Sequence, residues 1–272
     1  MPAALTSLQN PRVKAVVRLR DRRHRDEAGQ MLVEGRDELR LALAGGVRPI
    51  TLFHCPDLTH AADAGLLMQA ATLGAEIVEV SSPVFAKMAY RDNPDGWLAV
   101  VPAVRRTLAD LTLGDRPLLV IAEAVEKPGN LGALLRTADA AGVTAVIVCD
   151  PTTDLNNPNV VRSSRGTLFT VPVVEASTAD TLAWLRAHGI AIVAATPAAS
   201  RAYTAVDLTG PVAIAVGTED EGLTPAWLAQ ADLAVRIPMA GRVNSLNVSA
   251  AAALLIYEAV RQRSATPTAP RP

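Results

Sequence analysis

Short apolar runs alternate with amphipathic segments along the first hundred residues. Strands are predicted over four runs rich in β-branched, aliphatic and aromatic residues: 30–34, 49–54, 76–80 and 97–101. Helices are predicted between them, where apolar residues recur at helical spacing: over 36–44, over 61–73 and from residue 82. Glycines follow the first two of these helices, as expected at helix ends. The alternation predicts a compact α/β domain over residues 1–103.

The same alternation restarts after a charged segment, 104–116, which we interpret as a linker. Strands are predicted over five apolar runs: 118–121, 145–149, 191–195, 212–216 and 233–237. Helices are predicted over 131–141, over 177–188, from residue 225 and over 247–261. This order predicts an α/β domain over 117–264 with a mostly parallel sheet covered on both faces. The remaining segment, 265–272, is rich in Pro, Thr and Ala and is predicted to be disordered.

The charge composition adds one feature to this picture, a basic run within residues 12–25. The 272-residue chain has 3 % aromatic residues and a formal net charge of −1, which argues against a uniformly basic protein with aromatic platforms for bases. The average hides a run of seven basic residues with a single acid, Asp21: Arg12, Lys14, Arg18, Arg20, Arg22, Arg23 and Arg25. A solvated charged helix is the alternative explanation of this run.

Several classes of protein and site are disfavoured. No stretch reaches the roughly 18 apolar residues of a membrane span, and no signal peptide is recognisable, so we expect a cytoplasmic protein without membrane contact. Cys55 and Cys149 lie far apart in apolar surroundings, which predicts buried free thiols. The histidines do not pair with cysteine at metal spacing, so no metal site is expected. The Gly-rich signature of dinucleotide sites, G-x-G-x-x-G, is absent.

Polar residues and glycines gather in three segments that follow strands of the second domain: 126–136, 215–225 and 237–249. The first holds Asn130, for which helix capping is an alternative role, and Arg136, for which a surface salt bridge is the alternative. Six residues of helix rotate by about 600°, a net 240°, so these two side chains converge only if Asn130 lies in the preceding loop.

The second segment is an acidic loop between two glycines and contains Glu219. It follows a buried strand, where ligands of open α/β sheets bind, although a merely solvated turn is the alternative. The third segment holds Ser245 and Asn247 and runs into an Ala-rich helix that either residue could cap. The small residues of that helix suggest a close contact, including one with a second subunit.

In chain order these segments read N-x-G-x-x-x-R, V-G-x-E-x-x-G-L and I-P-M-x-G-x-x-x-S-L-N-V-S. Together they resemble the three motifs of the SPOUT-class, SpoU/TrmH-type RNA ribose 2′-O-methyltransferases. The segment 164–169 also resembles the corresponding part of the thiostrepton-resistance methyltransferases. The likeness covers the second domain, whereas the first domain is similar to an L30e-like substrate-binding module only in its order of elements.

The resemblance implies a SPOUT α/β domain with a deep trefoil knot and a homodimer formed through it. It implies S-adenosylmethionine as cofactor, contacted near Thr196, Gly217, Ile237, Met239 and Leu246. It assigns the catalytic site to Asn130, Arg136, Glu219, Ser245 and Asn247. Because arginine stays protonated, we expect Arg136 to hold phosphate or to stabilise the emerging alkoxide rather than to act as a free base.

RNA binding is predicted for the seven basic residues of the 12–25 run, together with Arg162 and Arg165. The function implied is S-adenosylmethionine-dependent methylation of a ribose 2′-hydroxyl in RNA, with 23S ribosomal RNA as the leading substrate. Two alternatives stay open: a transfer RNA ribose 2′-O-methyltransferase, and a non-catalytic RNA-binding dimer of the same fold.

Overall fold

The computed structural model describes residues 4–59, 64–218, 220–242 and 245–265. Within these residues the chain forms two compact units. Unit 1 comprises the chain up to Val104 together with Asp154–Thr170, and unit 2 comprises Arg105–Thr153 and the chain from Val171 onward. The segment Asp154–Thr170, which the sequence analysis assigned to the second domain, therefore packs with the first.

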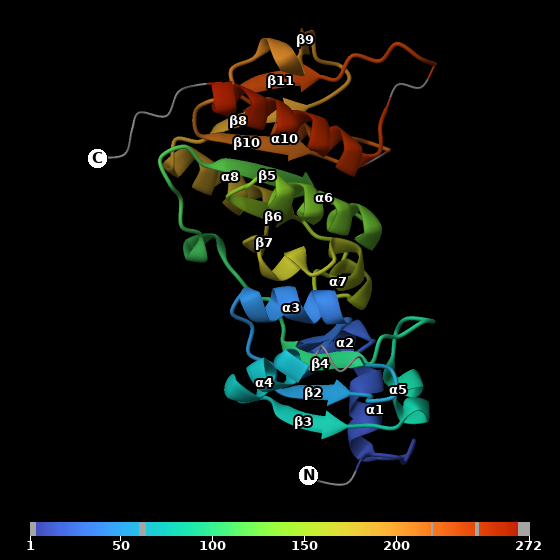
Figure 1. The fold of residues 1–272 in the computed structure, drawn as a ribbon. Helices are drawn as coiled ribbons and strands as arrows, with labels where there is room; N and C mark the ends of the chain where they lie inside the picture. The colour runs from blue at the N-terminus through green and yellow to red at the C-terminus, as the bar shows by residue number, and fades with distance from the viewer. Residues whose placement is uncertain (1–3, 60–63, 219, 243–244, 266–272) are drawn as a thin grey trace, which may run out of the picture. The chain divides into compact units, whose positions relative to one another are not determined.

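Unit 1 is built on a four-stranded sheet in the order β1-β4-β2-β3 (Figure 1). The strands are β1 (Gln30–Glu34), β2 (Thr51–His54), β3 (Glu76–Glu79) and β4 (Trp97–Pro102). The central strand β4 runs antiparallel to β1 and to β2, and β2 pairs with β3 in parallel. The core beside this sheet combines strand residues such as Phe53 and Leu98 with Val13, Val16 and Phe85 from the helices.

Six α-helices of unit 1 are described: α1 (Pro11–Arg18), α2 (Arg22–Ala28), α3 (Arg36–Ala44), α4 (Ala64–Thr72), α5 (Ser82–Met88) and α7 (Pro158–Ser164). Side-chain capping bonds begin three of them, α1, α2 and α7. Asn10 and Asp21 accept the backbone N–H groups of Arg12 and Arg23 and so cap α1 and α2. Helix α7 and the following 3₁₀ turn, η3 (Thr167–Phe169), pack against β1 and α3.

Unit 2 is built on a seven-stranded sheet in the order β7-β6-β5-β10-β8-β11-β9. The strands are β5 (Leu118–Glu123), β6 (Ala145–Cys149), β7 (Val173–Ala176), β8 (Ala191–Ala195), β9 (Arg201–Ala202), β10 (Val212–Val216) and β11 (Leu233–Arg236). All six strand pairs are parallel. Every residue of β5, β6 and β10 is buried, as expected for strands covered on both faces.

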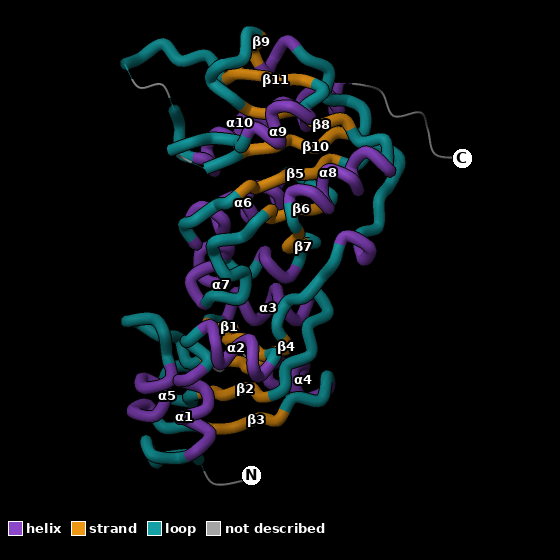
Figure 2. The backbone as a smooth tube through the Cα atoms, turned by 180° about the vertical axis from the view of Figure 1, so that it is seen from behind, coloured by secondary structure: helices purple, strands orange, loops and turns teal. Residues whose placement is uncertain are grey.

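Helices cover both faces of this sheet. Figure 1 shows α6 (Pro128–Ala140) and α10 (Val248–Ala265) on one face, and Figure 2 shows α8 (Thr178–Ala187) and α9 (Pro225–Gln230) on the other. Helix α6 packs against α10, and α8 packs against α9. Two 3₁₀ turns, η2 (Leu108–Asp110) and η4 (Tyr203–Ala205), complete the unit. The predicted α/β class with a parallel sheet is confirmed.

Several elements were not predicted. The short strands β7 and β9 and the helix α7 were not predicted from the sequence. For the run that forms α1 and α2, a helix was raised only as the alternative to RNA binding. The stretch interpreted as a linker contains η2, which begins in a capping box made by Thr107 and Asp110. Leu108, Leu111 and Leu113 of this stretch pack against the core of unit 2, so the stretch belongs to that unit from Arg105 onward.

The two cysteines, Cys55 and Cys149, are buried free thiols, as predicted. Across the described residues, no helix is long and apolar enough to span a membrane. Among the same residues, no group of three or more His, Cys, Asp or Glu side chains is placed to hold a metal ion.

Candidate functional site

A cavity of about 280 Å³ lies in unit 2 where strands β8, β10 and β11 end. Because parallel strands place their carboxyl ends at one edge of the sheet, loops that are distant in sequence meet there. This volume is slightly below the roughly 300–1,000 Å³ typical of small-molecule sites. It is lined by residues following each of these three strands and by the start of α10.

All five residues predicted to bind the cofactor line this cavity: Thr196, Gly217, Ile237, Met239 and Leu246. Gly217 has a structural reason to be glycine, because a Cβ there would lie 2.1 Å from the backbone carbonyl of Gly222. The backbone that approaches Gly217 closely is therefore that of Gly222 in the same loop. From the sequence, Gly217 was expected only to lie near the cofactor.

The charge of the cavity is negative. Among the described lining residues only Asp220 and Glu221 carry a charge, and both are exposed acids. The remaining wall is small or apolar, with Leu228, Ile237 and Leu246 as larger side chains. Such a cavity suits a ligand that combines positive charge with apolar surface.

Two of the predicted catalytic residues meet directly. The Nδ2 group of Asn247 donates a hydrogen bond of 3.0 Å to Oδ1 of Asn130. Asn247 also accepts the backbone N–H of Ser249 at 3.0 Å, so it acts at the start of α10 as well. Asn247 therefore caps α10, as the alternative interpretation allowed, and the same side chain joins the first and third motifs.

The other predicted catalytic residues are distributed differently. Ser245 lines the cavity, and Glu219 lies outside the described residues. Asn130 is inside α6, not in the preceding loop, so the net rotation of about 240° to Arg136 places these two side chains on different faces of the helix. Arg136 is exposed, is not among the described residues that line the cavity, and makes no hydrogen bond or ion pair within the described chain.

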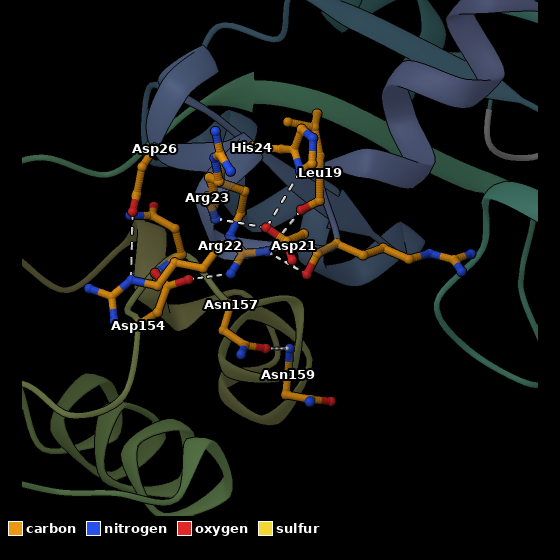
Figure 3. A network of polar contacts seen from close by, with 12 residues as sticks. Leu19, Asp21, Arg22, Arg23, His24, Asp26, Asp154, Asn157 and Asn159 are labelled. Atoms are coloured by element: carbon orange, nitrogen blue, oxygen red, sulfur yellow. Dashed lines mark hydrogen bonds and ion pairs between the residues drawn. The ribbon is translucent and has the colours of Figure 1, made fainter.

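The prediction that Arg25 binds RNA is wrong. Its side chain is 2 % exposed, and Nη1 donates to the carbonyl oxygens of Leu19 at 2.9 Å and Arg20 at 2.7 Å. Nη2 forms an ion pair with Asp154, shown with its neighbours in Figure 3. The guanidinium is held inside unit 1 and is unavailable to a phosphate.

The other basic residues of the run are mostly held by partners. Arg22 and Arg23 form exposed ion pairs with Asp26 and Glu27, one turn further along α2. Arg12 donates to Glu76 at 2.9 Å, and Arg20 donates to the carbonyl oxygens of Lys87 and Ala89. Lys14 and Arg18 are exposed on α1, and within the described chain neither side chain has a hydrogen-bond or ion-pair partner.

Arg162 and Arg165 belong to the same unit as this run. Both are exposed on the segment Asp154–Thr170, and Arg165 Nη2 lies 3.7 Å from Asp37 Oδ2. Sequence order separates them from α1 by more than a hundred residues, whereas the fold groups them with Lys14 and Arg18 in unit 1.

Sequence reasoning missed Glu123, the last residue of β5. It is an acid at the carboxyl end of an otherwise apolar, fully buried strand. Buried acids of this kind require hydrogen-bond partners, and that position in the sequence was the available signal.

Comparison with known proteins identifies the family. The profile of the SpoU rRNA methylase family matches residues 117–257, and the profile of the MRM3-like substrate binding domain matches residues 10–99. The chain belongs to the SpoU rRNA methylase family, as its three motifs predicted.

Relatives extend over both units. An uncharacterised tRNA/rRNA methyltransferase of Synechocystis sp. is 33 % identical, with 98 % of this chain and 96 % of that protein covered. The 23S rRNA (uridine(2479)-2′-O)-methyltransferase of Streptomyces viridochromogenes is 32 % identical, with 93 % and 90 % covered.

Solved structures agree. An RNA 2′-O ribose methyltransferase is 43 % identical with a TM-score of 0.84, covering 96 % of this chain and 100 % of its own. The AdoMet-bound rRNA methyltransferase of Sinorhizobium meliloti is 33 % identical with a TM-score of 0.87, covering 95 % and 97 %.

Proposed function

We propose that this protein transfers a methyl group from S-adenosylmethionine to a ribose 2′-hydroxyl of 23S ribosomal RNA. The observation that carries the proposal is the cavity at the ends of β8, β10 and β11, lined by the second and third family motifs. The Asn130–Asn247 hydrogen bond adds the first motif to the same end of the sheet. Relatives named as ribosomal RNA 2′-O-methyltransferases, and the AdoMet-bound neighbour, support this activity and cofactor.

The described residues fit the cofactor. Its sulfonium carries a positive charge, which the acidic side chains of Asp220 and Glu221 favour, and its adenosine offers surface for Leu228, Ile237 and Leu246. Thr196 and Gly217 line the same cavity and are assigned to contact the cofactor as well. When bound, the cofactor supplies an electrophilic methyl group, and the protein must align that group with the ribose oxygen.

The 2′-hydroxyl is a poor nucleophile until its proton is removed, so charge must be stabilised as it develops on the oxygen. We assign this stabilisation to the permanently protonated Arg136. Asn130 and Asn247 hold one another and orient the ribose, with Ser245 at the cavity wall. Glu219 is assigned to orienting Arg136 or to taking part in proton removal.

RNA affinity is assigned to unit 1. Lys14 and Arg18, with Arg162 and Arg165, are exposed cations on one compact unit, and such groups bind phosphates without reading sequence. Residues 10–99 match a substrate-binding profile, which supports this assignment. We further propose that this unit is L30e-like.

We also propose a homodimer formed through unit 2. An apolar hollow on α10 is lined by Ala250, Ala253, Leu254 and Tyr257, and the last two are exposed. Large exposed apolar side chains around a hollow are typical of an interface. The deep trefoil knot of this family and a cytoplasmic location, where ribosomal RNA is modified, complete the proposal.

Methyl transfer to defined RNAs tests the function. The full chain is incubated with radiolabelled S-adenosylmethionine and either an unmodified 23S rRNA transcript or bulk tRNA, and nucleosides are separated after digestion. We expect a 2′-O-methylated nucleoside from 23S rRNA, and none with Arg136→Ala. Label in tRNA alone would replace the substrate by tRNA, and cofactor binding without any transfer would favour the non-catalytic RNA-binding dimer.

A further inference from the structure

We propose that Glu123 is a positioning residue that holds one wall of the cofactor cavity through Thr224. The inference rests on the proposed function of that cavity. The wall is the segment 217–224, which we call the cofactor loop. It follows β10 and ends where α9 begins.

The cofactor loop contributes much of the cavity surface. Its described lining residues are Gly217, Thr218, Asp220, Glu221, Gly222 and Leu223. The position of this short segment therefore determines whether a ligand fits. A displacement of the loop would move Asp220 and Glu221, the acidic side chains of the described lining, at once.

Hydrogen bonds inside the loop close it on itself. Thr218 and Gly222 exchange two backbone hydrogen bonds of 3.1 Å. The hydroxyl of Thr218 also accepts the backbone N–H of Glu221 at 3.1 Å. These bonds define the shape of the loop but do not attach it to the sheet, and Leu223 packs against the apolar core.

Glu123 supplies the directional attachment. Glu123 is the last residue of β5, an interior strand of the sheet. Its side chain is 2 % exposed, and both of its carboxylate oxygens accept hydrogen bonds from one residue. Oε2 accepts the backbone N–H of Thr224 at 2.8 Å, and Oε1 accepts the Thr224 hydroxyl at 2.6 Å. Hydrogen bonds to an ionised group are stronger than neutral ones, especially away from water.

Thr224 is committed to this interaction. It precedes Pro225 at the start of α9, where a threonine hydroxyl commonly caps the helix, but its side chain makes no capping bond. The hydroxyl is directed to Glu123 instead. Because β5 pairs with β10, with Ala122 opposite Val216, Glu123 lies on the strand next to the root of the loop. The sheet thus holds both ends of the cofactor loop.

Three variants of the full chain test this role. Glu123→Ala removes both bonds, and Thr224→Val removes the hydroxyl bond. Glu123→Gln is the conservative control, because its amide oxygen can accept the Thr224 N–H and its amide nitrogen can donate to the hydroxyl. We expect Glu123→Ala to weaken S-adenosylmethionine binding about tenfold or more in calorimetry, as expected when a charged hydrogen bond is removed. Thr224→Val should have a smaller effect, and Glu123→Gln should retain most of the affinity, because both hydrogen bonds persist although they are no longer charged.

The kinetic signature separates positioning from a general loss of folding. We expect a raised KM for S-adenosylmethionine, with kcat at saturating cofactor and RNA affinity unchanged. Where Glu123→Ala fails to fold, Thr224→Val carries the test. A wild-type affinity for S-adenosylmethionine in Glu123→Ala would overturn the proposal. If Glu123→Ala does not fold, a wild-type affinity in Thr224→Val would overturn it.

Hydrogen exchange measured without cofactor tests the attachment of the loop by Glu123 separately from the proposed methyltransferase function. We expect faster exchange of the amides in the cofactor loop in Glu123→Ala than in wild type, with β10 unchanged. If wild type fails to bind S-adenosylmethionine but the variant still loosens the loop, the proposed function fails and the attachment stands. Unchanged exchange in the loop would refute the attachment itself.

Discussion

Arg25 is a buried cation that joins three parts of unit 1 through its guanidinium group. It ties the end of α1 to Asp154, the first residue of the segment that carries α7, and Asp154 in turn accepts the backbone N–H of Asn156 at 2.8 Å. Removing one partner of a buried ion pair leaves the other charge without compensation. This side chain therefore serves stability, although its position in a basic run suggested RNA.

We expect Asp154→Ala to destabilise unit 1 by about 3–5 kcal/mol, the usual cost of leaving a buried partner unpaired. The paired replacement Arg25→Met with Asp154→Leu should recover much of this loss, because no buried charge remains. Urea denaturation measures the effect, followed by fluorescence of the buried Trp97 in a background where Trp184 and Trp227 of unit 2 are replaced by Phe. Arg23→Ala, which breaks an exposed ion pair, serves as control and should change stability little. Equal effects of Asp154→Ala and Arg23→Ala would contradict the role of Arg25.

Cys149 illustrates the opposite case, a group that burial keeps neutral. Desolvation, with help from the nearby negative charges of Asp150 and Glu123, raises the pKa of its thiol to about 12 from 9.0. Between these values the unfolded chain loses the proton and the native chain keeps it, so the free energy of unfolding falls as pH rises.

We therefore expect the stability of wild type, relative to Cys149→Ala, to decrease as pH is raised from 8 toward 11, and urea denaturation at each pH would measure it. A thiol-specific reagent should not react with native Cys149 at pH 8. Rapid modification in the native state, or a stability difference independent of pH, would show that the thiol is not protected.

At the scale of elements, α1 divides its residues by face. Val13 and Val16 are buried in the core of unit 1, whereas Lys14 and Arg18, four residues apart, lie together on the exposed side. In α2, by contrast, Arg22 and Arg23 are each neutralised by an acid one turn away. The pair Lys14 and Arg18 can therefore bind a phosphate without breaking an ion pair, whereas Arg22 and Arg23 cannot.

We expect Lys14→Ala with Arg18→Ala to weaken RNA binding and to lower the salt slope of log K by up to about 0.7–0.9 for each phosphate that is no longer neutralised. The matched double variant Arg22→Ala with Arg23→Ala removes the same charge and should have a smaller effect. Filter binding at several salt concentrations compares them. Equal losses of affinity in the two variants would mean that net charge alone determines RNA binding.

Elements with a strong local signal were predictable. Strands β5, β6 and β10 are buried throughout, and continuous apolar runs identify such strands. Helix α7 has seven residues and packs on β1, a partner far away in sequence, so its apolar pattern was too short to recognise. Strand β7 is also short, with two buried residues, and owes its existence to pairing with β6.

The site was predictable to a similar degree. The second and third motifs located residues around the cavity, because each of them follows a strand of one parallel sheet. No described residue of the first motif lines it. The Asn130–Asn247 bond and the Glu123–Thr224 attachment join residues 117 and 101 positions apart, and no local spacing encodes such pairs. The engagement of Arg25 was hidden for the same reason, since its carboxylate partner lies 129 positions away.

For the whole molecule, the position of Arg136 raises the question of which subunit it serves. In a single chain it lies on a different face of α6 from Asn130 and away from the described lining of the cavity. The proposed dimer resolves this if each cavity is completed by Arg136 of the other subunit. Each homodimer would then hold two equivalent sites, each built from both chains.

Mixed dimers discriminate between the two arrangements. One chain carries Arg136→Ala and keeps its cavity, and the other carries Gly217→Val, whose side chain would collide with the backbone of Gly222 and disrupt its own cavity. Each variant alone should be inactive, with Arg136→Ala losing about 10²–10³-fold in rate, as expected when a group that stabilises developing charge is removed. Co-expression with two affinity tags isolates the mixed dimer. If Arg136 acts across the interface, the intact cavity of one chain receives the intact arginine of the other, and the mixed dimer regains one working site, half of the wild-type activity. If Arg136 acts within its own chain, no site is complete and the mixed dimer stays inactive.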